Sequence, residues 1–256
     1  MGRVYPFSEI ATCLSDANSQ VKGCVVDTSF LIAVVYELDP FNEDAVKLFH
    51  SLAEAKIPLY STVTSKSEYL ERCRRIILTE ALLEIRAQND HLQLGPDVYK
   101  ELKNLKQWVD DQLVLDRQPV AHDRRLKTIK KLLSRQNLTN ENAWLKMCEL
   151  LLKGKVKTAW EDVTDLLGIT HLDLGDPSIQ SLVPQKVTWD KAFEICETSG
   201  MGLYDSMIVN MLNCSIFPVA VSTDFDFAYA ALSGSTNKSI LIPDKIAAKC
   251  SDLIFW

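Results

Sequence analysis

The sequence predicts an α/β fold in which helices cover both faces of a central parallel sheet. Short apolar segments rich in Val and Ile, which indicate buried strands, alternate along the chain with amphipathic segments that indicate helices. This alternation is typical of a three-layer α/β/α architecture with a parallel sheet. The chain has 256 residues, of which 47% are hydrophobic and 24% charged, so it is long enough to bury a large core.

The first part of the core is predicted by two strands, each with a helix after it. The segment 23–27 is short and β-branched, so we expect a buried strand there. An amphipathic helix is expected over 42–55 and a second strand over 57–61. The apolar residues of 65–78 then recur at the spacing of one helical face, which predicts a further helix.

The middle of the chain predicts a helical insertion. The segment 82–167 is rich in Leu with helical periodicity, and we expect no strand within it. Gly and Pro residues over 173–188 indicate a connecting loop. Two more helices (189–198 and 203–212) and two more strands (218–222 and 239–242) complete the expected elements. We therefore expect one domain over 1–256, with its core in 22–81 and 189–256 and an insertion over about 82–188.

Composition excludes several classes of protein and site. No segment has the ~18 apolar residues of a membrane helix, and the first twenty residues lack the layout of a signal peptide. We therefore expect a cytoplasmic protein without membrane association. The seven cysteines show no CxxC spacing, the four histidines are scattered, and no glycine-rich phosphate loop occurs. Carboxylate chemistry is what remains.

Acidic residues stand where the expected parallel strands end. Asp27 closes the first strand, while Asp224 and Asp226 follow the strand over 218–222. Glu68 and Asp205 lie near the starts of two expected helices. Because sites in such folds lie beyond the carboxyl ends of the strands, we expect these acids to cluster there.

A cluster of this kind repels itself unless a cation neutralises it. Oxygen-only ligands suit Mg²⁺ or Mn²⁺, and one or two such ions can activate water for phosphodiester hydrolysis. The acids therefore favour a metal-dependent nuclease or phosphatase.

Each acid also has an ordinary structural interpretation. Asp205 would be favoured in the first turn of any helix, and Asp224 or Asp226 could cap the next one. Glu68 could pair with Arg72 on the helix surface. Asp27 fits such an interpretation least well, because an acid between an apolar strand and an apolar stretch is costly to bury without partners.

Four motifs in order resemble those of the PIN-domain nucleases, and most closely the VapC-like, toxin-type group. They are Val-Val-Asp-Thr-Ser-Phe-Leu-Ile at 25–32, Thr-Val-Thr-Ser-Lys-Ser-Glu at 62–68, Leu-Tyr-Asp-Ser-Met-Ile at 203–208 and Ser-Thr-Asp-Phe-Asp-Phe at 222–227. The resemblance covers about 22–78 and 189–242. It implies an α/β/α ribonuclease that depends on Mg²⁺ or Mn²⁺. For such an enzyme we expect in-line attack by a metal-activated water, which leaves 5′-phosphate and 3′-hydroxyl ends.

The resemblance also implies a role for each site residue. Asp27, Glu68, Asp205 and Asp224 match the family's catalytic acids. Asp27, Asp205 and Asp224 would bind the metal, joined by Asp226 as the second Asp of the closing motif, and Glu68 would complete the shell or position the water. Thr28, Ser29 and Ser222 would support these acids. Toxin members are usually dimers inhibited by an antitoxin, so a homodimer and a protein inhibitor of that kind are implied partners beside the RNA substrate.

The chain departs from this family pattern in two places. The insertion makes it far longer than a toxin-type member, which leaves its substrate and any toxin role open. Glu71 also lies one helical turn after Glu68 and offers a second carboxylate for the same position.

Basic residues gather within the insertion although the whole chain carries a net charge of −6. The stretch 117–135 holds seven Lys and Arg residues against one Asp, and three Arg residues follow Glu68. We expect RNA phosphates to bind there, and the alternative is a solvated helix face. The candidate RNA-binding residues are Arg72, Arg75, Arg124, Lys127, Lys130 and Lys131.

Two other functions compete with a nuclease. A haloacid-dehalogenase-type phosphatase needs a second Asp two residues after the first, where this chain has Ser29. A non-catalytic scaffold of the same fold would bind RNA or protein, although it has no physical reason to keep self-repelling carboxylates.

Overall fold

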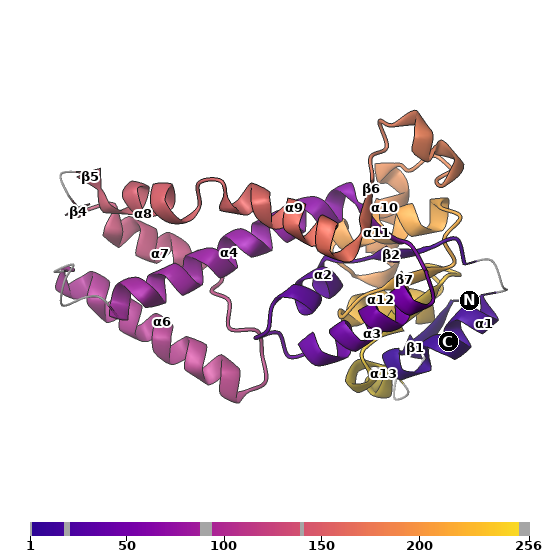
Figure 1. Cartoon of the computed structure of the whole chain (residues 1–256), viewed down its shortest axis with the longest axis horizontal. Coiled ribbons are helices and arrows are strands. Elements are labelled where there is room, and N and C mark those ends of the chain that lie inside the picture. The colour runs from indigo at the N-terminus through magenta and orange to yellow at the C-terminus, as the bar shows by residue number, and fades with distance from the viewer. Residues whose placement is uncertain (1, 18–20, 88–93, 139–140, 251–256) are drawn as a thin grey trace. The chain divides into compact units, whose positions relative to one another are not determined.

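The computed structural model describes residues 2–17, 21–87, 94–138 and 141–250 (Figure 1). These residues form two compact units. The first, here called the sheet unit, comprises Met1–Glu37, Phe41–Tyr69 and Val163–Trp256. The second, the helical unit, comprises Leu38–Pro40 and Leu70–Asp162, so its bounds differ from the segment 82–188 expected as the insertion.

A six-stranded sheet lies at the centre of the sheet unit, and all its strands are parallel, which confirms the predicted α/β fold. The strand order is β1-β8-β7-β2-β3-β6. The strands are β1 (Arg3–Pro6), β2 (Cys24–Val26), β3 (Leu59–Thr62), β6 (Ile169–Leu172), β7 (Val219–Val221) and β8 (Ser239–Ile242).

Helices cover both faces of this sheet. Every residue of β2 and β7 is buried, and because successive side chains of a strand point to opposite faces, neither face of these strands meets solvent. The helices of the unit are α1 (Ile10–Asp16), α2 (Thr28–Val35), α3 (Asn42–Glu54), α10 (Trp189–Ser199), α11 (Leu203–Cys214), α12 (Phe225–Leu232) and α13 (Asp244–Cys250), with 3₁₀ turns η1 (Phe7–Glu9) and η2 (Pro177–Ser181).

The four predicted strands and the helices predicted over 42–55, 189–198 and 203–212 are confirmed within a few residues. The edge strands β1 and β6 are additions. Each has four residues, a partly exposed burial pattern and a neighbour on one side only, so neither carries the continuous apolar run that marks a central strand. Strand β6 comes from the segment that the sequence assigned to the insertion.

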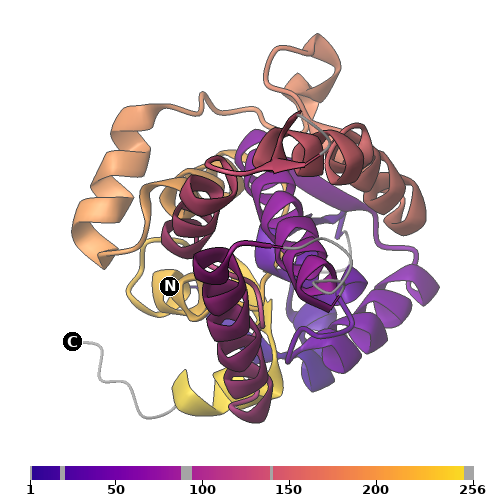
Figure 2. The same cartoon turned by 90° about the vertical axis from the view of Figure 1, so that its left-hand side faces the viewer.

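The helical unit is built from α4 (Val63–Ala87), α6 (Pro96–Val114), α7 (Asp123–Leu133), α8 (Ala143–Leu151) and α9 (Lys155–Leu167), of which α4 and α9 begin or end in the sheet unit. Leu82, Leu102, Leu105 and Ile129 are buried together in its core. Figure 2 shows the helices of this unit side by side in a second view.

The expectation that no strand occurs within 82–167 was wrong. Two-residue strands β4 (Asn137–Leu138) and β5 (Glu141–Asn142) form a short antiparallel ladder before α8. Strands of two residues are too short to produce an alternating pattern that sequence could reveal. In the part of the chain that the structure describes, no helix is long and apolar enough to cross a membrane.

Candidate metal centre

Asp27 stands at the junction between β2 and α2. Its backbone N–H donates to the Val221 carbonyl oxygen at 2.9 Å, which continues the pairing of β2 with β7. Its side chain then caps α2 by accepting from the Ser29 backbone N–H. Only 3% of the residue is exposed. The carboxylate is therefore fixed by the end of one strand and the start of one helix.

Two hydroxyl groups hold one oxygen of this carboxylate. Ser29 Oγ donates to Asp27 Oδ2 at 2.6 Å, and Ser222 Oγ donates to the same atom at 3.0 Å. Ser29 Oγ also accepts from the Thr223 backbone N–H, and Ser222 Oγ accepts from the Asp224 backbone N–H, each at 2.9 Å. The network connects the end of β2 to the end of β7.

The other oxygen of Asp27 has a different environment. Asp27 Oδ1 is buried and finds no hydrogen-bond partner among the described residues. An unpaired buried carboxylate oxygen is costly, because it has lost its hydration without replacement. A cation at this atom would remove that cost.

Glu68 approaches from the first turns of α4, directly after β3. Thr28 Oγ1 lies 3.0 Å from Glu68 Oε2 and 3.2 Å from the Ser65 carbonyl oxygen, so it links the start of α2 to α4. The start of α4 is itself fixed by Thr62, whose Oγ1 accepts from the Ser65 backbone N–H at 3.1 Å. Thr62 and Ser65 are buried positioning residues that the site prediction did not include.

Asp205 lies in the first turn of α11, as predicted. A Cβ atom at Gly202 would come within 2.8 Å of Asp205 Oδ2, so the carboxylate occupies space that any larger residue at 202 would take. The only signal for this in the sequence is the glycine three residues before the acid.

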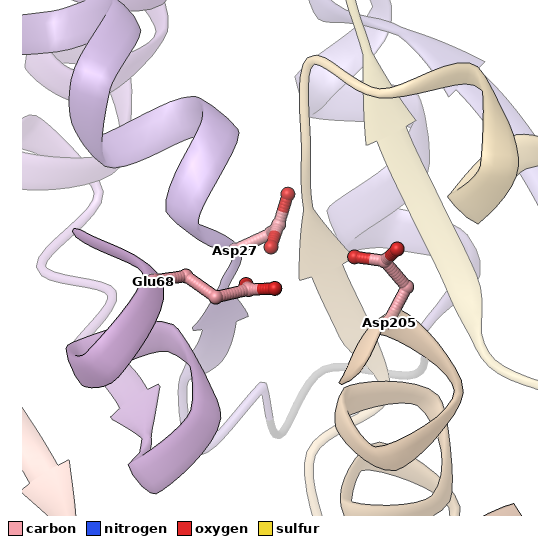
Figure 3. A group of neighbouring side chains, drawn as sticks. All are labelled: Asp27, Glu68 and Asp205. Carbon is pink, nitrogen blue, oxygen red and sulfur yellow. The ribbon is translucent and has the colours of Figure 1, made fainter. Parts of the chain in front are cut away.

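Asp27, Glu68 and Asp205 meet as a triad. Each offers one carboxylate oxygen, and these three oxygens lie within 4.8 Å of one another, close enough to share a metal ion. Figure 3 shows the three side chains pointing toward a common space, Asp27 from the junction of β2 and α2, Glu68 from α4 and Asp205 from α11. Asp27 is buried, and the other two are half-buried. All donors are hard oxygens, which are the ligands of divalent cations such as Mg²⁺, Mn²⁺ and Ca²⁺.

The protonation equilibria of the triad reflect crowding of negative charge. Burial raises the pKa of Asp27, and the charge of Asp224 adds to this, while the hydrogen bonds from Ser29 and Ser222 oppose it. Burial and the charges of Asp27, Glu68, Asp224 and Asp226 raise the pKa of Asp205 to about 8. Without a cation, the site therefore retains a proton near neutral pH.

Asp224 and Asp226 stand beside the triad rather than in it. Asp224 is exposed and caps α12, because its Oδ1 accepts from the Asp226 backbone N–H at 3.0 Å. Burial, followed by the charge of Asp224, raises the pKa of Asp226. The capping interpretation of Asp224 is thus confirmed, and its charge still acts on Asp27 and Asp205.

The structure distinguishes Glu68 from Glu71. Glu71 lies outside the triad and makes two hydrogen bonds to Arg74, at 2.8 Å to Nε and 2.5 Å to Nη2. The carboxylate of Glu71 is therefore ion-paired with a guanidinium that also binds Asp123, and it lies outside the triad to which Glu68 supplies an oxygen.

The place of the triad follows from the strand order. Strand β2 lies between β3 and β7, so the chain leaves β2 toward one side of the sheet and β7 leads on to β8 on the other. A crevice forms where the connections diverge in this way, beyond the carboxyl ends of the strands, and ligands bind there in open α/β sheets.

The six candidate RNA-binding residues lie in the helical unit, while the carboxylates lie in the sheet unit. Arg72 and Arg75 are half-buried on α4. The other four are exposed on α7: Arg124, Lys127, Lys130 and Lys131.

Comparison of the chain with protein-family models, curated proteins and solved structures gave no match.

Proposed function

We propose that this protein is a Mg²⁺- or Mn²⁺-dependent endoribonuclease of the PIN type. The observation that carries the proposal is the buried Asp27, whose unpaired Oδ1 belongs to a carboxylate that meets Glu68 and Asp205 at the carboxyl edge of a parallel sheet. The order of the four acidic motifs, which resembles that of the PIN nucleases, supports the same conclusion.

The residues present fit a hard divalent cation. Asp27, Glu68 and Asp205 would hold it, and Asp224 and Asp226 add negative charge nearby. Such an ion supplies a Lewis acid that activates water and stabilises negative charge on a phosphodiester. No histidine or cysteine belongs to the triad, which favours Mg²⁺ or Mn²⁺ over Zn²⁺.

Residues around the triad orient its carboxylates. Ser29 and Ser222 fix one oxygen of Asp27, and the other is left without a hydrogen-bond partner among the described residues. Thr28 orients Glu68. Burial and neighbouring charges raise the pKa of Asp205 to about 8, so a cation bound there would favour the carboxylate and release a proton from this group.

The proposal is tested by incubating labelled single-stranded RNA and DNA with the full chain. We expect cleavage of RNA with Mn²⁺ that stops in EDTA and falls more than about a hundredfold in Asp27→Asn. The exposed Asp190, in the first turn of α10, provides a matched control, and Asp190→Asn should cleave like the unaltered chain.

Other results would contradict the proposal. Cleavage that survives both EDTA and Asp27→Asn would come from a contaminant or a different site. Lack of cleavage across a broad RNA panel, together with no response of the melting temperature to millimolar Mn²⁺, would leave the non-catalytic scaffold as the better account.

A further inference from the structure

Helix α7 has one apolar face and one cationic face. Leu126, Ile129 and Leu133 are buried in the core of the helical unit. Arg124, Lys127 and Lys131 are exposed and follow one another at intervals of three and four residues, so they form a single row on the opposite face. This row is called the cationic face below.

The cationic face takes part in no ion pair in the part of the chain that the structure describes. Among the residues that the structure describes, none of its three cations makes an ion pair. The only acid of α7 is Asp123, and Arg74 on α4 binds it at 2.8 Å. The row therefore carries positive charge that no described ion pair offsets.

Two further cations of α7 are already engaged by aromatic rings. The Arg125 guanidinium lies 5.0 Å from the centre of the Trp108 ring, and Lys130 Nζ lies 5.9 Å from that of Trp144. Both distances suit cation–π attraction. These contacts tie the flanks of α7 to the unit and leave the cationic face directed to solvent. Arg124 also lines a hollow together with His122, Arg125 and Thr128 and with one acid, Glu101 on α6.

The composition of this face favours a polyanion with a regular backbone. No large hydrophobic side chain of α7 is exposed, so the helix lacks the apolar or aromatic anchor on which stable protein interfaces depend. A row of flexible cations is instead what phosphate groups require. The whole chain has a net charge of −6 and does not attract polyanions. A row of cations provides a local surface that does.

We propose that the cationic face of α7 binds the phosphodiester backbone of single-stranded RNA, making the helical unit the substrate-binding part of the protein. That this RNA is a substrate rests on the proposed function of the triad. The binding itself does not, and the two are tested separately.

The experiment measures binding of a fluorescent single-stranded RNA to the full chain by anisotropy. The Asp27→Asn variant in EDTA serves as the background, so that no RNA is cut. Replacing Arg124, Lys127 and Lys131 by Glu should weaken binding by at least about tenfold at ~100 mM salt. The slope of log affinity against log salt should also become less steep by about 2, because each phosphate contact on a single strand contributes about 0.7 and three contacts are removed.

A matched control reverses the same amount of charge elsewhere. Lys47, Lys157 and Lys191 are exposed, and each is already paired with a Glu, at 3.8, 3.4 and 2.6 Å. Their triple replacement by Glu should change RNA affinity by less than about threefold, because separated surface charges are screened by salt. Circular dichroism and thermal melting of both variants verify that they fold.

Four outcomes decide between the possibilities. Unchanged affinity and salt slope in the α7 variant, or equal losses in both triple variants, would overturn the proposal. Displacement of RNA by polyglutamate as effective as by polyuridylate would overturn the assignment to RNA and favour an acidic protein segment. If binding depends on α7 but the chain never cleaves RNA with Mn²⁺, the inference stands and the nuclease proposal fails.

Discussion

The two carboxylate oxygens of Asp27 differ in their hydrogen bonding, and this difference determines its chemistry. Ser29 and Ser222 both donate to Oδ2, and Oδ1 has no partner among the described residues. Supporting hydrogen bonds of this kind orient a metal ligand and raise its affinity. The two serines are therefore expected to act through Asp27 rather than by touching the ion themselves.

Replacing Ser29 and Ser222 together by Ala should lower Mn²⁺ affinity by about 10- to 100-fold, because Asp27 then loses the bonds that direct it. Isothermal titration calorimetry measures this. Ser67→Ala provides the control. Ser67 directly precedes Glu68 in the sequence, but it is exposed, and its hydroxyl group donates to the backbone oxygen of Thr64. Equal affinity in the double variant would show that the serines have a purely structural role.

Glu68 and Glu71 allow a second comparison at this scale. Glu68→Gln should reduce RNA cleavage by more than about tenfold, since it removes one of three charged oxygens from the triad. Glu71→Gln loses only an ion pair with Arg74 and should retain activity. Rates measured under single-turnover conditions with saturating Mn²⁺ distinguish the two variants. If Glu71→Gln lost activity and Glu68→Gln kept it, Glu71 and not Glu68 would belong to the metal site.

The raised pKa of Asp205 predicts how stability depends on pH. In the metal-free folded chain this pKa is about 8, against an ordinary value of 3.8. Between these values the folded state keeps a proton that the unfolded state has lost, so the free energy of unfolding should fall as pH rises from about 4 to 8. Asp205→Asn should remove part of this slope, as measured by urea unfolding in EDTA at several pH values. Parallel curves for the two proteins would refute the prediction.

At the scale of elements, the central strands could be predicted and the edges could not. Strands β2 and β7 are buried on both faces and appear in the sequence as continuous apolar runs. Strands β1 and β6 have one neighbour each and are partly exposed, so neither appears as a continuous apolar run. Helix α2 is short and apolar throughout, so it lacks the amphipathic pattern by which longer helices are recognised.

The candidate site could likewise be predicted only in part. Asp27, Glu68 and Asp205 could be proposed from their places after strands and at helix starts. Asp224 lies outside the triad and caps α12, and Thr62 and Ser65 fix the start of α4. Such details arise from side-chain geometry, which periodicity does not contain.

The two faces of α7 make an element-scale prediction. Ile129→Ala, on the buried face, should lower the free energy of unfolding by about 2–5 kcal/mol through lost packing. Lys127→Ala, on the cationic face, should change it by less than about 0.5 kcal/mol. Denaturant unfolding measures both. Similar losses in the two variants would mean that Lys127 also packs against the unit, and the cationic face would then be misassigned.

At the scale of the whole molecule, the triad and the cationic face belong to different compact units. A ligand that binds only the folded state stabilises the part of the chain that holds its site. Hydrogen exchange should therefore slow in β2, β7 and α11 when Mn²⁺ is added, with little change in α6 and α7. Equal protection of both units would show that they unfold as one cooperative body.

The strand order also determines at which point of synthesis the backbone around Asp27 can be completed. Strand β2 carries Asp27 near the beginning of the chain, but one of its two neighbours is β7, which ends at Val221. A chain emerging from the ribosome cannot complete the pairing beside Asp27 until the residues up to Val221 have been made. Any chemistry that depends on the triad would thus wait for the synthesis of β7, and a product that ends before β7 would lack the backbone pairing that holds Asp27.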